Sequence, residues 1–354
     1  MHVVEPFASG VLRFLIDLTT QQVKEYEIYI LYGVRPQTPA NVEQLFDKRI
    51  HLIQIRAFQG AMKTVMNPKS YIDIYKYYKK IRPDILHFHS SASGFVGRLI
   101  LPCRKQPSFY TPHGYSFLMR NTSFLKRTLF WLAEYLLAKF PTQTIACSKG
   151  EYEESLKLSK NSTYVNNGIN TKELEPYISN SPQPKQTIKV CTSGRIQYQK
   201  NPFLFNQIAN KLPDVEFIWI GDGELKTELT APNIKITGWI KREKVLNILK
   251  DVDFFLLPSL WEGLPIALLE AMYIKKICIV SNVIGNKDVI ISGQNGIICN
   301  SADEYVKAIC DVKKGKINGK ILSEKASLDV KKNYNIELMV QKYNQIYCNS
   351  LQNH

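Results

Sequence analysis

The chain has 354 residues, 45% of them hydrophobic, and a formal net charge of +15 with an isoelectric point of about 9.3. This length predicts two domains that each bury a core, and no apolar run approaches the ~20 residues of a membrane span. The charge favours anionic partners, but the sequence lacks zinc-finger spacing, an aromatic RNA-binding strand and a dense arginine tract, so nucleic acid is not expected. A pyrophosphate-bearing substrate, an anionic membrane surface or simply a lysine-rich soluble surface would each explain the charge.

The seven cysteines lie far apart, and no pair has the spacing of a metal knuckle or a redox motif. We expect buried, reduced thiols, as in a cytosolic protein. A positively charged leader followed by an apolar signal core is also missing. These features predict a cytoplasmic protein, or one bound peripherally to the cytoplasmic face of the membrane.

Short runs rich in Val, Ile and aromatic residues alternate along the chain with longer segments of helical period. The first half has predicted strands at 1–4, 28–32, 51–56, 84–88, 107–111 and 143–147. The second half has them at 188–193, 215–220, 234–237, 252–257, 277–280 and 296–299. Helices are predicted at 11–22, 68–81, 202–211, 241–250, 265–274 and 335–348. This alternation predicts two α/β domains, each a doubly wound, Rossmann-like parallel sheet with helices on both faces.

The segment 171–186 contains three prolines among polar residues, and it cannot form a central strand or the interior of a helix. We interpret it as a linker between an N-terminal domain, 1–170, and a C-terminal domain, 187–334. The last segment, 335–354, begins with a helix that could cross back to the first domain. Ligands of such sheets bind beyond the carboxyl ends of the strands, so a cleft between the two facing domains is the expected site.

Two further features belong to the N-terminal half. The first strand is short enough to suggest a misassigned start or a few missing residues. His87 and His89 alternate on an apolar strand, and we expect one in the core and one at the cleft. Metal binding is not expected there, because the sequence places no third ligand.

The segment 117–139 mixes aromatic and aliphatic residues with four Lys and Arg residues and a single acid, Glu134. It could lie in the interface of an anionic bilayer, with the Tyr- and Lys-rich segment 71–82 adding positive charge. It could equally pack in the N-terminal core, with its basic side chains reaching water. The residues leave both interpretations open.

In the second half, several loops that follow strands carry residues suited to a phosphate. Arg195 and Lys200 lie between the strand 188–193 and a helix that Asn201 and Pro202 begin, and their charges can meet a ligand phosphate. Two exposed surface cations would be the simpler explanation of this feature alone. Glycines after the next two strands allow close backbone approach to a ligand, but each is a weak signal. These are Gly221 and Gly238, the latter followed by Trp239.

The strongest motif is the segment 258–271, which joins a buried strand to an apolar helix. Glu262 lies in its loop and Glu270 lies in the helix, with seven residues between them. Glu262 can accept hydrogen bonds from sugar hydroxyls, and Glu270 can hold both hydroxyls of a ribose. Alternatively, Glu262 caps the helix and Glu270 is solvated. However, Glu270 lies inside an apolar run, where an acid without a partner would be costly to bury.

The same motif offers a site for a diphosphate. Pro265 at the start of the helix leaves the amides of Gly263 and Leu264 facing outward, at the positive end of the helix dipole.

Together these residues resemble glycosyltransferase family 4, whose members are retaining enzymes of the GT-B fold. The resemblance rests on Ser193-Gly194-Arg195, Lys200-Asn201-Pro202, Gly221-Asp222-Gly223, Gly238, Pro258-Ser259, Glu262-Gly263-Leu264-Pro265 and Glu270-Ala271. The first half matches more loosely, through residues 83–89, Pro112-His113-Gly114, Ala146-Cys147-Ser148 and residues 167–170. The chain departs from the family pattern where paired glycines are common, at Ser9-Gly10, and after Gly285, where Asn286 and Asp288 replace a Gly and a Glu.

The resemblance implies a role for each candidate. Arg195 and Lys200 would neutralise the donor diphosphate, Glu262 would contact the donor sugar, and Glu270 would bind the ribose. His113 would lie near the donor sugar and support the transition state or the acceptor. The remaining donor-binding residues would be Ser9, Gly10, Gly221, Gly238, Trp239, Gly263 and Leu264.

The implied reaction passes a sugar from a nucleoside diphosphate, expected to be UDP, to a saccharide or a polyprenyl-diphosphate-linked saccharide. Bacterial capsule, exopolysaccharide or O-antigen assembly is the expected setting. Two cations and helix-terminal amides would stabilise the departing diphosphate, so we expect no metal and no other cofactor. The departing phosphate would help to deprotonate the acceptor, and no protein general base is assigned.

Other functions stay open at this point. A nucleotide-sugar epimerase or hydrolase of the same fold would use the same donor site. An NAD-dependent oxidoreductase would need a Gly-x-Gly-x-x-Gly turn after the first strand, which is missing. A non-catalytic membrane-associated protein would not need the intact charged set.

Overall fold

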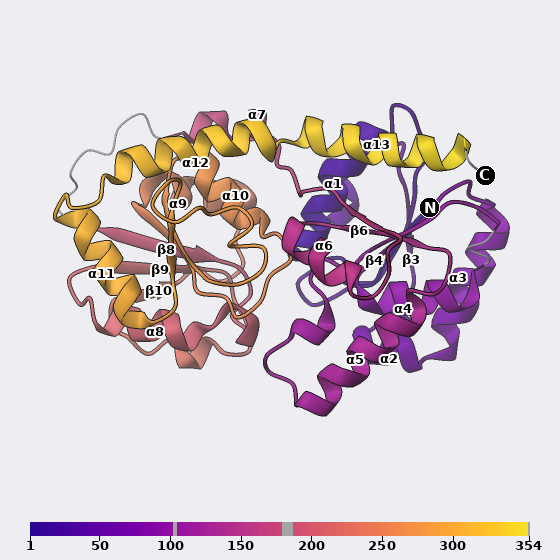
Figure 1. Cartoon of the computed structure of the whole chain (residues 1–354), viewed down its shortest axis with the longest axis horizontal. Helices are drawn as coiled ribbons and strands as arrows, with labels where there is room; N and C mark the ends of the chain where they lie inside the picture. Colours follow the sequence, from indigo (N-terminus) through magenta and orange to yellow (C-terminus); the bar gives the residue numbers. More distant parts are fainter. Residues whose placement is uncertain (102–104, 179–186, 353–354) are drawn as a thin grey trace. The chain divides into compact units, whose positions relative to one another are not determined.

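The computed structural model describes residues 1–101, 105–178 and 187–352. The chain divides into two compact units. Unit 1 consists of Met1–Gly168 together with Ile336–His354, and unit 2 consists of Ile169–Asn335. Each unit is a parallel β-sheet flanked by helices (Figure 1).

The described part of unit 1 has a seven-stranded sheet in the order β3-β2-β1-β4-β5-β6-β7. Its strands are β1 (His2–Val4), β2 (Tyr29–Tyr32), β3 (His51–Gln54), β4 (Leu86–His89), β5 (Ser108–Thr111), β6 (Gln143–Ala146) and β7 (Ser162–Tyr164). Its α-helices are α1 (Ser9–Gln22), α2 (Ala61–Met66), α3 (Pro68–Ile81), α4 (Ser91–Ile100), α5 (Phe124–Leu137), α6 (Lys149–Leu156) and α13 (Ile336–Gln352). Short 3₁₀-helices lie at Val42–Leu45 and Ser116–Leu118.

The described part of unit 2 has a six-stranded sheet in the order β10-β9-β8-β11-β12-β13. Its strands are β8 (Lys189–Ser193), β9 (Glu216–Ile220), β10 (Ile234–Ile236), β11 (Phe254–Leu257), β12 (Ile277–Ser281) and β13 (Ile297–Cys299). Its α-helices are α7 (Thr171–Leu174), α8 (Pro202–Asn210), α9 (Arg242–Asp251), α10 (Ile266–Tyr273), α11 (Ala302–Lys313) and α12 (Gly319–Asn333). Its 3₁₀-helices are Glu175–Tyr177, Tyr198–Lys200 and Lys226–Glu228.

The central strands read as nearly continuous apolar runs because helices cover both faces of each sheet. All four residues of β11 are buried, and so are all four residues of β4, although two of these are histidines. In each sheet the strand order changes direction at one place, between β1 and β4 in unit 1 and between β8 and β11 in unit 2. Loops that leave the sheet on either side of such a switch point form the usual ligand site of this architecture. The two-domain, Rossmann-like α/β fold predicted from the sequence is confirmed.

The structure differs from the prediction in the segment 171–186. Residues 171–177 are not a linker, since they form α7 and a 3₁₀-helix that belong to unit 2. Leu174 is fully buried there, and Pro176 is tolerated because it lies in the first turn of the 3₁₀-helix, where no amide hydrogen is needed. The chain leaves unit 1 after Gly168, and the rest of the predicted linker, 179–186, lies outside the described residues.

The first and last helices extend beyond their predicted bounds by two residues or more, the last of them to Gln352 and not residue 348. The first begins at Ser9 rather than residue 11, so Ser9 and Gly10 form its first turn and not a loop. The last helix, α13, groups with unit 1 and lies beside α1 (Figure 1). Within the described residues, none of the helices combines the length and the apolar character that crossing a membrane requires.

The described cysteines are all free thiols. Cys147, Cys191, Cys278 and Cys299 are buried as expected, whereas Cys310 is partly exposed and Cys348 is exposed.

Candidate active site

The glycines of unit 2 pack the loops at the carboxyl ends of the strands against one another. Gly194, after β8, and Gly221, after β9, have φ values of +139° and +141°. A side chain at Gly221 would collide with the Gly194 carbonyl, and Gly221 also pairs with Gly238 in an isolated antiparallel bridge. Contact between backbones therefore explains Gly221 without a ligand, and the positive φ of Gly194 explains the glycine there. Trp239, beside Gly238, is half exposed.

Lys200 and Glu262 form an ion pair at the switch point of unit 2. The Lys200 Nζ lies 2.6 Å from Glu262 Oε1, and only 15% and 7% of the two side chains are exposed. Further hydrogen bonds hold the loop after β8 to the loop after β11, including one from the Gln199 side chain to Glu262 Oε2 at 3.4 Å. The Leu260 amide donates to the Gln199 carbonyl, and the Gln199 side chain donates to the Trp261 carbonyl. The sheet thus brings together two residues that are 62 positions apart in sequence.

The second predicted phosphate ligand, Arg195, is also paired with an acid. Its Nε lies 3.0 Å from Glu224 Oε2, in a more exposed position than Lys200. The helix that follows starts as predicted: Asn201 accepts a hydrogen bond from the Leu204 amide, and Pro202 lies in the first turn of α8. Both cations therefore have anionic partners in the chain without a ligand.

The buried Glu270 has a partner that the sequence reasoning did not identify. The Arg242 Nη2, at the start of α9, lies 2.8 Å from Glu270 Oε1, and the Arg242 Nε lies 2.6 Å from Glu173 Oε1 in α7. Burial opposes the charge of Arg242, but Glu270 and Glu173 outweigh it, so the pKa of the guanidinium is raised above its ordinary value. The only signal in the sequence was indirect, since an acid inside an apolar helix requires a partner.

The turn between the two glutamates is supported by its neighbours rather than by Glu262. Pro265 is the N-cap of α10, without a side-chain cap, and the Glu262 carboxylate binds Lys200 instead. Gly263 and Leu264 are buried in this turn. Gly285, with φ of +84°, packs so closely on it that a side chain there would collide with the Gly263 carbonyl.

The residues that depart from the family pattern have structural partners nearby. Asp288 accepts a hydrogen bond from the Gly285 amide at 3.0 Å. Asn286 is buried and donates to the Ser281 carbonyl at 3.2 Å.

His113 lies in unit 1, just beyond β5. It is half-buried, has a φ of +54°, and places its Nε2 at 3.1 Å from His89 Nδ1. Phe14 packs edge-on against its ring, with centroids 4.8 Å apart. Burial lowers the pKa of His113 to about 3, so the ring is neutral near pH 7.

The predicted site residues thus fall into two groups, each described within its own unit. Unit 2 brings Arg195, Lys200, Gly221, Gly238, Trp239, Glu262, Gly263, Leu264 and Glu270 to the carboxyl edge of its sheet. Unit 1 holds His113 beyond β5 and the exposed Ser9 and Gly10 in the first turn of α1, after β1. That the two groups serve one site stays a prediction.

Comparison with known proteins shows similarity over most of the chain. The model of Glycosyltransferase Family 4 matches residues 8–173, and that of Glycosyl transferases group 1 matches residues 175–329. The UDP-Gal:alpha-D-GlcNAc-diphosphoundecaprenol alpha-1,3-galactosyltransferase of Escherichia coli is 31% identical, over 82% of this chain and 81% of that protein. The N,N'-diacetylbacillosaminyl-diphospho-undecaprenol alpha-1,3-N-acetylgalactosaminyltransferase of Campylobacter jejuni is 23% identical, over 88% and 89%.

Solved structures share the fold at low sequence identity. Sucrose-phosphate synthase from Thermosynechococcus elongatus superimposes with a TM-score of 0.84 at 16% identity, covering 100% of this chain and 99% of that one. Anabaena HepE in complex with UDP-glucose gives a TM-score of 0.78 at 14% identity, covering 98% and 99%.

Proposed function

This chain belongs to glycosyltransferase family 4 and has the GT-B fold. We propose that it transfers the sugar of a UDP-sugar donor to a lipid-diphosphate-linked saccharide, in the assembly of a bacterial surface polysaccharide. We further propose that the transfer retains the anomeric configuration and needs no metal. The observation that carries the proposal is the charged set at the switch point of unit 2, where Lys200, Glu262 and Arg242 surround the predicted donor motif. The two relatives named above act, by their names, on saccharides linked to undecaprenyl diphosphate.

The ion pairs of unit 2 support the assignment of the donor diphosphate. Lys200 is held beside Glu262, and Arg195 beside Glu224, so positive charge is already in place before a ligand arrives. A diphosphate offers these cations stronger, charge-assisted hydrogen bonds, and its charge grows as the sugar departs. We therefore propose that Lys200 and Arg195 provide electrostatic stabilisation of the leaving group.

Glu270 supports the assignment of the ribose. Arg242 contacts one oxygen of its carboxylate, and a carboxylate has about four acceptor positions in all. Since Oε1 is buried beside Arg242, we propose that Oε2 accepts from the two hydroxyls of a ribose. Arg242 keeps the group oriented for them.

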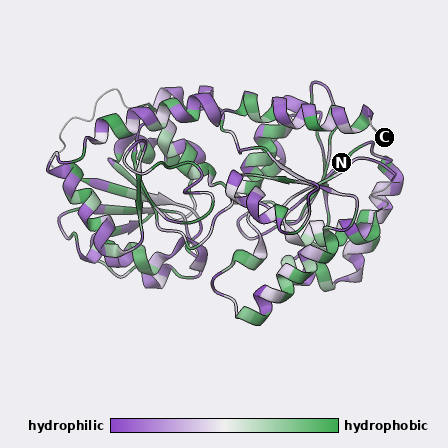
Figure 2. Cartoon of the chain, viewed as in Figure 1, coloured by the Kyte–Doolittle hydropathy of each residue, from purple (hydrophilic) through white to green (hydrophobic). Residues whose placement is uncertain are grey.

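Helix α5 supports an acceptor that lies in a membrane. One side of the helix packs inward through Leu137 and Glu134, whose carboxylate binds the buried Arg98 at 2.8 Å and the Tyr110 hydroxyl at 2.8 Å. The other side leaves five large apolar residues exposed by 43–83%: Phe124, Leu125, Leu129, Leu132 and Leu136. Figure 2 shows the hydrophobic colouring of this helix.

Charge on α5 points to the same partner. Its only acid is turned inward to Arg98, while Lys126 and Arg127 stay at the surface. An apolar face flanked by basic residues and free of exposed acids suits an anionic bilayer. We therefore propose that the protein binds peripherally to the cytoplasmic face of the membrane, where a lipid-linked acceptor would be presented.

The function is tested by measuring UDP release and acceptor glycosylation with a panel of UDP-sugars and undecaprenyl-diphosphate saccharides, with and without EDTA. Transfer to the acceptor that resists EDTA is the expected result, and Lys200→Ala and Glu270→Ala should abolish it. Lys211→Ala, which removes an exposed cation paired with Asp303, serves as the control. Rapid UDP release without any acceptor would instead indicate a hydrolase, and no release from any donor would overturn the proposal.

A further inference from the structure

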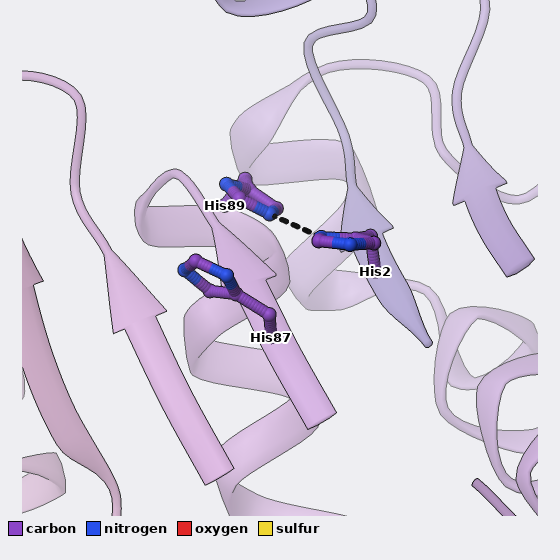
Figure 3. A group of neighbouring side chains, drawn as sticks. All are labelled: His2, His87 and His89. Carbon is purple, nitrogen blue, oxygen red and sulfur yellow. Dashed lines mark hydrogen bonds between the residues drawn. The ribbon is translucent and has the colours of Figure 1, made fainter. Parts of the chain in front are cut away.

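Three histidines gather inside unit 1, on the two strands at its switch point. His2 of β1 pairs in register with His87 of the neighbouring strand β4, and His89 lies two residues further on the same face. All three are buried, and nitrogens of the three rings lie within 4.8 Å of one another (Figure 3). Parallel pairing supplies the third histidine, which the sequence reasoning lacked.

Two of these histidines form a hydrogen-bonded chain that ends at His113. His2 Nδ1 lies 3.0 Å from His89 Nε2 (Figure 3), and His89 Nδ1 lies 3.1 Å from His113 Nε2. His89 therefore uses both ring nitrogens, one toward each neighbour. The chain connects the interior of the sheet to His113, the half-buried residue that the family resemblance predicts to lie near the donor sugar.

His87 does not join the chain. Its Nδ1 lies 2.5 Å from the Tyr347 hydroxyl, and its Nε2 lies 2.9 Å from the Thr111 hydroxyl. Both nitrogens of His87 thus have hydroxyl partners, and the facing nitrogens of His2 and His89 are partners of each other. The contacts therefore favour a hydrogen-bond chain over a metal centre.

The chain constrains where the protons lie. A neutral imidazole has one N–H and one lone pair. Burial lowers the pKa values of His2 and His89 well below the usual range, so both are neutral near pH 7. If His89 donates from Nδ1 to His113, it must accept at Nε2 from His2, and the His113 proton then lies on Nδ1. If the donor and acceptor exchange roles in one of these two hydrogen bonds, they must exchange roles in the other as well. The tautomers of His2, His89 and His113 are therefore coupled.

We propose that His89, supported by His2, is a positioning residue for His113: it holds the Nε2 side of the His113 ring inward and leaves Nδ1, in one set tautomer, for the substrate. This inference rests on the proposed function, because His113 matters only if it faces the donor sugar. It adds two buried residues to the machinery of transfer, neither of which touches the substrate.

The test compares two amides that mimic different nitrogens of His89. The side chain of Asn places its polar atoms near the position of Nδ1, and that of Gln places them near Nε2. His89→Asn can keep the bond to His113, whereas His89→Gln keeps only the bond to His2. We expect His89→Gln to lose about 100-fold in kcat, the cost of a catalytic group displaced by roughly 1 Å. His89→Asn should lose much less, and KM for the UDP-sugar should stay the same in both. Equal losses in the two variants would overturn the proposal.

A spectroscopic measurement keeps the test independent of activity. In ¹⁵N-edited NMR spectra of the wild type, His113 should show one neutral tautomer between pH 5.5 and 8. His89→Gln should give mixed tautomers or a titrating ring, while the exposed control His51→Gln should leave the His113 signal unchanged. An unchanged His113 signal in His89→Gln would overturn the proposed hydrogen-bond chain. It would also be overturned if the purified protein contained one equivalent of Zn²⁺ that His87→Gln removes. Absence of any transfer by the wild type would refute only the proposed function. The NMR spectra measure the His113 tautomer without activity, so they test the histidine hydrogen-bond chain independently.

Discussion

At the scale of single residues, the candidate donor site is built from acids and cations that satisfy each other. Lys200 and Glu262 are both largely buried, and removing one member of such a pair leaves the other charge without a partner. The two residues nevertheless have different proposed roles. Lys200 would bind the diphosphate, whereas Glu262 would contact the sugar and compete with the diphosphate for Lys200.

Substitutions at the two positions should therefore change UDP affinity in opposite directions. Lys200→Ala removes a charge-assisted hydrogen bond of about 1.5–3 kcal/mol and should weaken UDP binding by about 10- to 100-fold. Glu262→Gln frees Lys200 and should leave UDP binding equal or tighter while sugar transfer falls. Isothermal titration calorimetry with UDP checks both, with Lys211→Ala as the control. A similar loss of UDP affinity in both variants would mean that the ion pair only stabilises the folded loops.

Arg242 offers a second prediction, because it orients the proposed ribose ligand. Arg242→Gln should weaken binding of UDP and reduce the difference in affinity between UDP and 2′,3′-dideoxy-UDP, since Glu270 would no longer be held toward the ribose. Glu173→Gln is the matched control, because it removes the other partner of Arg242 and leaves the Glu270 contact in place. If Arg242→Gln weakens the binding of UDP and of 2′,3′-dideoxy-UDP by the same factor, Arg242 supports the fold and does not position Glu270.

At the scale of elements, the packing of α5 explains only one side of the helix. Its inner side uses a buried ion pair between Glu134 and Arg98, with the guanidinium also stacked on the Tyr110 ring at 4.0 Å. Its outer side exposes apolar residues that a helix in water would not normally display. The sequence left open whether this segment faces a membrane or the core, and the structure shows that one helix has an inner side and an exposed apolar side.

Replacing the outer side of α5 should therefore separate membrane binding from donor binding. We expect the triple variant L125S/L129S/L132S to lose binding to vesicles that contain phosphatidylglycerol while it keeps its affinity for UDP. Lys126→Ala should weaken vesicle binding by about 1 kcal/mol at low salt. Vesicle co-sedimentation measures both, and L328S, which alters an equally exposed leucine on α12, is the control. Retained binding in the triple variant would place the membrane contact elsewhere.

At the scale of the whole molecule, the chain builds two units that each have their own sheet and core. The proposed donor groups all belong to unit 2, except Ser9 and Gly10. Unit 1 is completed by α13, which is distant in sequence. Its Tyr347 packs against His87, and its Asn344 Oδ1 accepts a hydrogen bond from the Gln22 side chain of α1 at 2.8 Å. Unit 1 therefore needs both ends of the chain, whereas unit 2 is one continuous segment.

This organisation predicts that residues 169–335 fold and bind UDP when produced alone. The fragment should be inactive in transfer, and its affinity should be no more than about tenfold weaker than that of the full chain, the loss of one hydrogen bond to a charged group. Calorimetry and circular dichroism on the fragment check this. A folded fragment without affinity for UDP would show that unit 1 supplies most of the donor contacts.

The sequence by itself determined most of the strands and predicted the donor motif. Apolar periodicity and turn residues are local, so twelve of the thirteen strands in the described residues were predicted to within about two residues, whereas β7, Ser162–Tyr164, was missed. The two glutamates, Lys200 and Arg195 were predicted as one set through the family resemblance. The tertiary structure alone decided which distant residues meet: His2 with His89, Arg242 with Glu270, and Lys200 with Glu262. It also assigned residues 171–177 to a helical segment of unit 2 and turned Glu134 inward. The physical reason is that strand order and helix packing depend on burial summed over the whole chain. The periodicity of a short segment carries no information about which distant segments pack together.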